Sequence, residues 1–180
     1  MTKRQIQNEL THRHISFAEY TLTLDHNDYT FSFEQKWTAG QQLEHIVKSS
    51  EPILLGLKIP LWLLGILFGK SKKASMDYKQ LVQRYHEVLS KGGKSSRPFI
   101  PKTGESYGAE PLKNRLLLTI SKINLKIEEI SEEDLDHYRL PHPLLGKLTL
   151  REMLFFTIYH VEHHMEQTKQ NLRYLTVPPR

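Results

Sequence analysis

Hydrophobic residues recur at spacings of three and four along most of the chain, which is the period of an amphipathic α-helix. Segments of this kind cover residues 3–25, 75–90 and 110–130, with Lys, Arg and Glu between the apolar positions. Their length and periodicity predict three long helices, each with one face turned toward a shared core.

Two further helices are predicted from their first residues. In each, a Thr is followed three residues later by Gln or Glu, the pattern of a capping box: Thr38 with Gln41, and Thr149 with Glu152. We expect the second of these helices to continue to about Tyr174, before two prolines.

The connections between these segments lack helical periodicity. Residues 91–107 are rich in Gly, Pro and Ser, and residues 131–148 combine an acidic run with Pro-containing turns. Only Tyr29–Phe33 offers a weak strand pattern. The pattern therefore predicts an all-α fold, a four-helix bundle with irregular connections, and a length of 180 residues predicts a single domain, 1–180.

One strongly apolar stretch requires a separate interpretation. Residues 53–68 contain sixteen residues with one charge, Lys58, and are interrupted by Pro60. A helix of this length spans roughly 24 Å, less than the roughly 30 Å of a bilayer core. We expect no membrane span but a buried helix end followed by an apolar loop or short helix, with a membrane-surface or subunit contact as the alternative.

The amino-acid composition excludes several kinds of site and partner. The chain has no cysteine, which excludes disulfides, thiolate metal sites and a cysteine nucleophile. Its first ten residues are polar and show no secretion signal, so a cytoplasmic location is expected. Residues 69–102 hold nine Lys and Arg against two acidic residues but lack interleaved aromatics, so we expect no nucleic-acid partner.

Ten histidines are unusual for 180 residues, and three of them fall within residues 160–164. On a helix, His160 and His164 share one face with Thr157, and His163 does not. The spacing suits two imidazoles that bind one metal ion, although inward histidines with ordinary hydrogen bonds have the same pattern.

Three segments resemble the DinB-like and YfiT-like metalloenzymes. Residues 37–45 read WTAGQQLEH, residues 142–149 read HPLLGKLT and residues 160–167 read HVEHHMEQ. Together they are similar to the Trp and His segment, the entry to the last helix and the HxxxH motif of that family. The resemblance implies a bundle of DinB type, often a homodimer, with a divalent metal ion on His45, His160 and His164.

The resemblance and the helical wheel disagree about His45. On the wheel it lies with Gln41, Gln42 and Ser49, opposite the apolar face, so periodicity alone predicts that it is exposed. We expect instead that His45 lines an open cleft at the end of the bundle.

Three histidines on one ion leave a coordination position for a substrate, as in catalytic sites. The expected cofactor is Zn, Ni or Fe, since His-rich sites suit each of them. The resemblance implies a hydrolase or a transferase that uses a low-molecular-weight thiol, acting on a small-molecule substrate. The alternative is a non-catalytic metal-binding or stress-associated bundle.

Several neighbours are candidates for supporting roles. Thr157, Gln167 and Asn171 lie on the stripe of His160 and His164 and are expected to hydrogen-bond the ligands. His142 is expected to reach the mouth of the cleft. Glu44 and Glu162 each lie next to an expected ligand in the sequence. They are weaker candidates for a general base, because each points to a different face of its helix. The helical wheel of the last helix also predicts that Glu152 is solvated.

Overall fold

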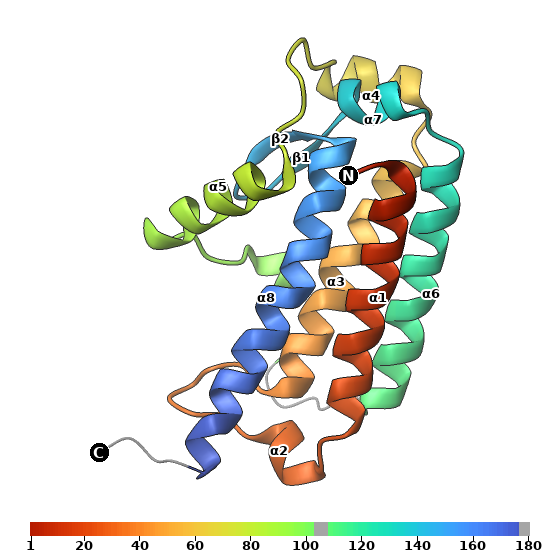
Figure 1. The fold of residues 1–180 in the computed structure, drawn as a ribbon. Coiled ribbons are helices and arrows are strands. Elements are labelled where there is room, and N and C mark those ends of the chain that lie inside the picture. Colours follow the sequence, from red (N-terminus) through yellow and green to blue (C-terminus); the bar gives the residue numbers. More distant parts are fainter. Residues whose placement is uncertain (103–107, 177–180) are drawn as a thin grey trace.

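The computed structural model describes residues 1–102 and 108–176, and it confirms the all-α prediction (Figure 1). The helices and strands follow one another as α1 (Lys3–Leu22), α2 (His26–Thr30), α3 (Ala39–Leu57), α4 (Leu61–Phe68), α5 (Tyr78–Ser90), the short 3₁₀ helix η1 (Arg97–Phe99), α6 (Ala109–Glu128), α7 (Glu132–His137), β1 (Arg139–His142), β2 (Gly146–Thr149) and α8 (Leu150–Thr176).

Four long helices lie side by side and enclose the core. Helices α1 and α3 each pack against both α6 and α8, as Figure 1 shows. The apolar periodicity of the sequence places the packed side chains, among them fully buried Leu10, Phe17, Leu43, Leu116 and Leu154. Apolar burial on this scale is the main force that holds such helices together.

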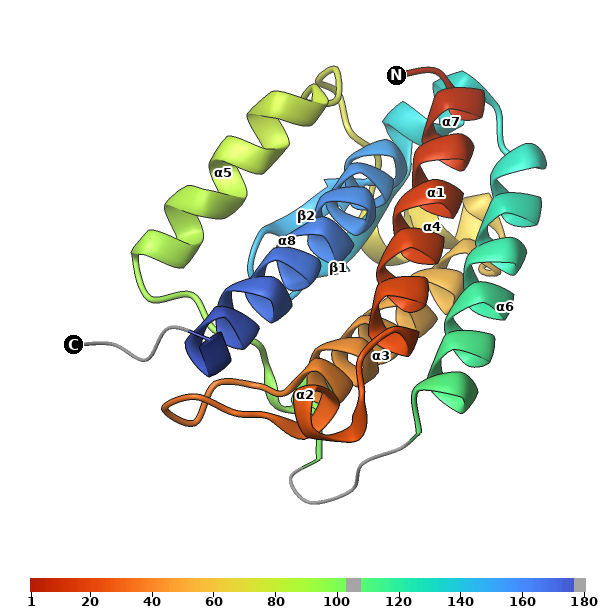
Figure 2. The same ribbon diagram turned by 60° about the horizontal axis from the view of Figure 1, so that its bottom comes forward.

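Helix α5 lies on the outer side of α8, away from α6 (Figure 2). It is joined to the bundle through α8, against which Tyr85 packs its ring at 5.4 Å from that of Phe156. The space between α3, α5 and α8 is the part of the molecule that holds the candidate site.

Both predicted capping boxes are present. At the start of α3, the Thr38 hydroxyl accepts a hydrogen bond from the N–H of Gln41, and the Gln41 side chain accepts one from the N–H of Thr38. At the start of α8, Thr149 and Glu152 make the same reciprocal pair at 2.9 and 3.2 Å. These bonds satisfy N–H groups that a helix cannot pair internally.

The prediction that Glu152 is solvated was wrong. Its carboxylate is buried and also accepts a hydrogen bond from the N–H of Met76 at 2.8 Å. The segment that leads into α5 therefore covers this side of α8. A helical wheel does not reveal such a contact because it involves residues 76 positions apart.

Two local predictions were wrong in the connections. The first two residues of the weak strand candidate, Tyr29 and Thr30, belong to α2, which Asp25 caps at its first turn. The acidic run of residues 131–148 forms α7, and the Pro-containing part forms an antiparallel hairpin in which Leu140 pairs with Leu148. The hairpin is two strands of four residues, too short for a clear alternation in the sequence.

The apolar stretch 53–68 is divided between two helices. At the end of α3, Ile53, Leu54 and Leu57 are buried and Leu55 is exposed. Helix α4 is buried mainly at Leu64 and leaves Trp62 and Ile66 largely exposed, at 66% and 72%. No single helix in the described ranges is long and apolar enough to cross a membrane, although α3 and α4, bent by 108°, pass that test as a pair. The predicted loop at 91–107 contains η1; its residues 103–107 lie outside the described part.

The Glu152 contacts predict a large effect on stability. In Glu152→Ala, the buried N–H of Thr149 and the partly buried N–H of Met76 lose their acceptor, so the free energy of unfolding should fall by about 2–4 kcal/mol. Urea denaturation followed by circular dichroism measures this change. The exposed Glu166 lies on the same helix, and Glu166→Ala should change the free energy of unfolding by less than about 0.5 kcal/mol. Equal effects would contradict the structural role of Glu152.

The burial of the His14 ring predicts that the stability of the fold depends on pH. Its ring lies inside the bundle with Nδ1 bonded to the carbonyl of Leu10, and burial lowers its pKa to about 4. The unfolded chain binds a proton here near pH 6.5 and the folded chain does not, so acidification favours unfolding.

Between about pH 6.5 and 4, His14 should therefore remove about 3 kcal/mol of the free energy of unfolding. Urea denaturation at several pH values should show this loss in the wild type and a shallower loss in His14→Leu. His12 is exposed, and His12→Leu should keep the wild-type slope. An unchanged slope in His14→Leu would show that His14 is not the titrating group.

Candidate metal centre

Two neighbouring helices bring three histidine rings together. Helix α3 carries His45, and α8 carries His160 and His164 one turn apart. The Nε2 atom of His160 lies 3.0 Å from Nε2 of His164 and 3.2 Å from Nε2 of His45. Within residues 1–102 and 108–176, this is the one group of His, Asp or Glu side chains with the spacing of metal ligands.

The wheel-based prediction that His45 is exposed was wrong, since its side chain is only 4% exposed. Two segments outside α3 cover the polar face of the helix. The Trp37 ring lies 4.9 Å from the His45 ring, and the carbonyl of Phe99 accepts a hydrogen bond from its Nδ1 at 2.6 Å. This face of α3 is therefore a wall of the site.

Hydrogen bonds determine which nitrogen of each ring carries the proton. Nδ1–H of His45 donates to the Phe99 carbonyl, and Nδ1–H of His164 donates to Oε1 of Gln42 in a short contact. The Ser49 hydroxyl donates to the carbonyl of Ile46, so its oxygen accepts Nδ1–H of His160 at 3.4 Å. All three Nε2 atoms consequently present lone pairs to one another.

The surroundings keep these rings uncharged. Burial is the largest cause that lowers the pKa of His45, and it takes the pKa of His160 and His164 well below the usual value. His160 and His164 also lie near other imidazoles, and a positive charge on one ring would disfavour protonation of the next. Near pH 7 the group is therefore a set of three neutral nitrogen donors, the protonation state that metal binding requires.

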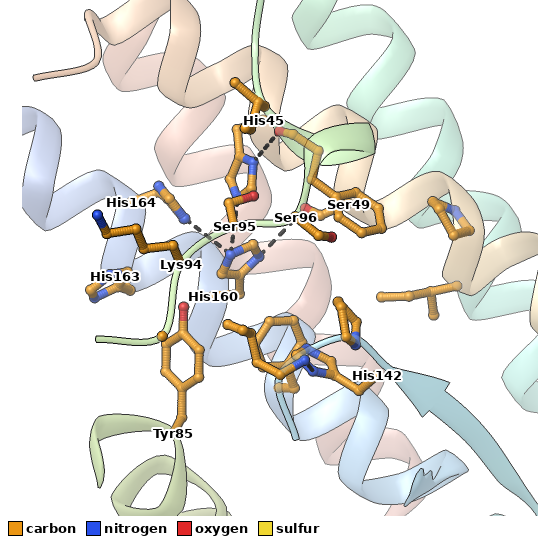
Figure 3. A pocket seen from close by; sticks show the side chains of 18 of the residues that line it. His45, Ser49, Tyr85, Lys94, Ser95, Ser96, His142, His160, His163 and His164 are labelled. Carbon is orange, nitrogen blue, oxygen red and sulfur yellow. Dashed lines mark hydrogen bonds between the residues drawn. The ribbon is translucent and has the colours of Figure 1, made fainter. Parts of the chain in front are cut away.

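A large cavity opens beside the three rings. It has a volume of about 1060 Å³ and is lined mostly by apolar side chains from α3, α8, the β1–β2 turn and residues 93–100. Figure 3 shows His45, His160 and His164 converging on it, with Lys94 and Ser95 from the connecting segment close to them. The expected cleft is thus present, along the side of α8 and not only at one end of the bundle.

His163 lies outside the group of three. Its ring is half-buried, 5.2 Å from the ring of His164, and its Nε2 lies 3.0 Å from the side-chain amide of Gln167. It lines the cavity without joining the convergent Nε2 atoms. This position agrees with the helical face assigned to it from the sequence.

The predicted supporting residues have other contacts. The Thr157 hydroxyl donates to the carbonyl of Met153 in its own helix, and Asn171 bonds the backbone of Phe31 and Phe33. Gln167 contacts His163 and not a convergent ring. Asn171 therefore binds the segment before Trp37 to α8, and this contact helps to hold the Trp37 ring over the site.

The side chains that orient the rings were missed by the sequence analysis. Gln42 and Ser49 lie on the same stripe of α3 as His45, at spacings of three and four residues. That stripe of polar side chains is a usable signal, because a polar face beside a motif histidine can itself be buried. The Phe99 carbonyl has no such signal, since a backbone group 54 residues away carries no pattern.

Neither candidate for a general base faces the rings. The Glu44 carboxylate binds Nζ of Lys48 at 2.6 Å and the N–H of Lys102 at 3.2 Å, while Glu162 pairs with Arg13 on the exposed side of α8. No Asp or Glu of the described residues lines the cavity. Proton transfer there would have to use imidazole or hydroxyl groups, or a group that the ligand brings.

Comparisons with known proteins agree with this architecture. A search among curated proteins finds no match. A sequence profile of the DinB superfamily matches residues 9–168, a range that includes all three convergent histidines and most of the chain. The chain therefore belongs to the DinB superfamily.

Proposed function

We propose that His45, His160 and His164 bind one divalent metal ion and that the protein is a metal-dependent enzyme acting on a small molecule. The observation that carries this proposal is the convergence of three Nε2 lone pairs, each made available by a hydrogen bond at the Nδ1 of the same ring. Three buried lone pairs that face one another repel unless a cation lies between them.

The residues fit such an ion by chemistry as well as by position. Zn, Ni and Fe all accept imidazole nitrogen, and each ring has the outer hydrogen bond that metal-binding histidines usually have. A bound ion supplies Lewis acidity, which acidifies a coordinated water or thiol and polarises a carbonyl. The protein's own contribution is to hold the rings neutral, fix their tautomers and shield them with Trp37.

The cavity favours an enzyme over a non-catalytic metal carrier. A structural metal site is usually closed by a fourth protein ligand, and no fourth His, Asp or Glu of the described residues joins the group. A cavity of about 1060 Å³ beside the rings provides space for a substrate.

We propose a reaction of the hydrolase or thiol-dependent transferase type, for which an ion held by His45, His160 and His164 would supply the Lewis acidity that activates a water or a thiol. The absence of a lining carboxylate in the described residues supports this, because a carboxylate base is then not at hand. The chain contains no cysteine, so a thiol would have to be a small co-substrate.

Metal binding is tested by equilibrium dialysis with Zn, Ni or Fe. Wild type should bind one ion per chain. His45→Ala, His160→Ala and His164→Ala should each lose more affinity than the roughly 10- to 100-fold that loss of an outer hydrogen bond costs. The matched control is His163→Ala, which removes an adjacent imidazole and should keep the wild-type affinity.

Two results would contradict this assignment. Equal loss of metal from His163→Ala and His164→Ala would show that the wrong face of α8 had been chosen. Full retention of metal in His45→Ala would remove α3 from the site.

The outer hydrogen bond from His164 to Gln42 has its own prediction. Gln42→Leu removes the acceptor that keeps Nε2 of His164 unprotonated, so metal affinity should fall roughly 10- to 100-fold. The exposed Gln83 lies outside the cavity, and Gln83→Leu should bind metal like the wild type. Competition with a chromogenic chelator measures both, and an unchanged affinity in Gln42→Leu would exclude this role.

Access of a substrate to the ion is tested with the cobalt-loaded protein. Titration with 2-mercaptoethanol should produce a sulfur-to-cobalt absorption band in the near ultraviolet, because three protein ligands leave a position open. Absence of the band at saturating thiol, with cobalt bound, would mean that the coordination is closed and would favour the non-catalytic alternative.

A further inference from the structure

The HPLLGKLT segment contains a histidine that the proposed metal site does not use. His142 ends β1 and is 8% exposed. Its Nδ1 accepts hydrogen bonds from the N–H of Leu144 at 3.1 Å and the N–H of Leu145 at 3.0 Å. Because Nδ1 is an acceptor twice, the proton of the neutral ring is on Nε2.

The Nε2–H group of His142 is free to bind a ligand. It has no hydrogen-bond partner in the described ranges, and the ring lines the cavity, as Figure 3 shows. Burial lowers the pKa of His142 to about 4, with a smaller contribution from Arg84, so the ring stays uncharged. His142 is therefore a neutral donor of one hydrogen bond.

The wall around this donor is apolar. The His142 ring meets the edge of Phe156 at 4.2 Å between ring centroids, and Phe156 in turn stacks on His160 at 4.6 Å. Other lining groups from the neighbouring elements are Ile53, Leu140 and Met153. One phenyl ring thus separates the donor from the convergent histidines.

The part of the cavity near His142 differs in charge from the part near His163 and His164. Lys94 lies beside His163 and His164 in Figure 3, away from His142. Arg84, the cation whose charge acts on His142, bonds the carbonyl of Leu145 at 2.7 Å and does not line the cavity. A carboxylate placed against His142 would therefore be buried among apolar groups without a cation to contact, which is costly. An uncharged carbonyl oxygen accepts the same hydrogen bond without that cost.

We propose that the cavity binds a largely apolar molecule and that Nε2–H of His142 donates a hydrogen bond to its uncharged carbonyl oxygen. The volume of about 1060 Å³ is just above the roughly 300–1,000 Å³ typical of small-molecule sites. His142 thereby selects and orients the ligand. This assignment does not depend on the metal ion.

A matched pair of ligands tests the hydrogen bond. Butyrophenone and butylbenzene have the same carbon skeleton and differ by a carbonyl in place of a methylene. Each is used to displace N-phenylnaphthylamine, a neutral fluorescent probe of apolar cavities, from the full-length protein as purified and after chelator treatment. The measured quantity is the ratio of the two dissociation constants.

The variant is His142→Asn, in which Oδ1 takes the place of Nδ1 and can still accept the two backbone N–H groups, as in an Asx turn. It removes Nε2–H, and its own amide Nδ2–H₂ takes the position of Cδ2, one bond short of Nε2. The two backbone N–H groups keep an acceptor, so stability should remain near the wild type. The preference for the ketone should fall roughly five- to tenfold, the value of one neutral hydrogen bond. The control His12→Asn, at an exposed position, should keep the wild-type ratio.

Three results would overturn the proposal. The first is an unchanged ratio of the two dissociation constants in His142→Asn, and the second is failure of the neutral probe to bind the wild type. The third is loss of the ketone preference after chelator treatment, which would mean that the metal holds the ketone. A measurement on the wild type avoids dependence on the variant: the ¹⁵N resonance of His142 Nε2 should shift with butyrophenone more than with butylbenzene. Equal shifts would also overturn it.

Discussion

Three imidazole lone pairs that face one another inside a protein are the constraint on which the rest of this site depends. Each ring has its other nitrogen engaged by a protein acceptor: the Phe99 carbonyl, the Ser49 hydroxyl or the Gln42 amide. The acceptors come from α3 and from the segment that follows α5. Burial keeps the rings neutral, and a neutral set of nitrogen donors is what a divalent cation requires.

The two capping boxes determine where the helices that carry these rings begin. The box at Thr38 starts α3 seven residues before His45, and that at Thr149 starts α8 eleven residues before His160. Glu152 extends the second box to the backbone of Met76, so the start of α8 is tied to the approach to α5. Because α5 covers one side of the cavity through Tyr85, the same carboxylate links helix capping to the shape of the site.

The cavity combines an apolar wall with a few polar groups whose protonation is set by their neighbours. His142 and the three convergent histidines are all uncharged at neutral pH, yet hydrogen bonding gives them opposite roles. In His142 the backbone occupies Nδ1 as a donor and leaves an N–H for the cavity, whereas in the other three the protein accepts from Nδ1 and leaves a lone pair. One residue type therefore supplies both hydrogen-bond donation and metal coordination.

The sequence by itself determined the helical content, both capped helix starts and the common face of His160 and His164, because these depend on spacing within one helix. The family resemblance brought in His45, which the helical wheel had placed in solvent. Only the tertiary structure decided that the polar face of α3 is buried, that residues 139–149 form a hairpin and that Glu152 is an internal acceptor. The physical reason is that a periodic pattern divides a helix into two faces, whereas burial of the polar face depends on segments such as Trp37 and Phe99 that fold over it.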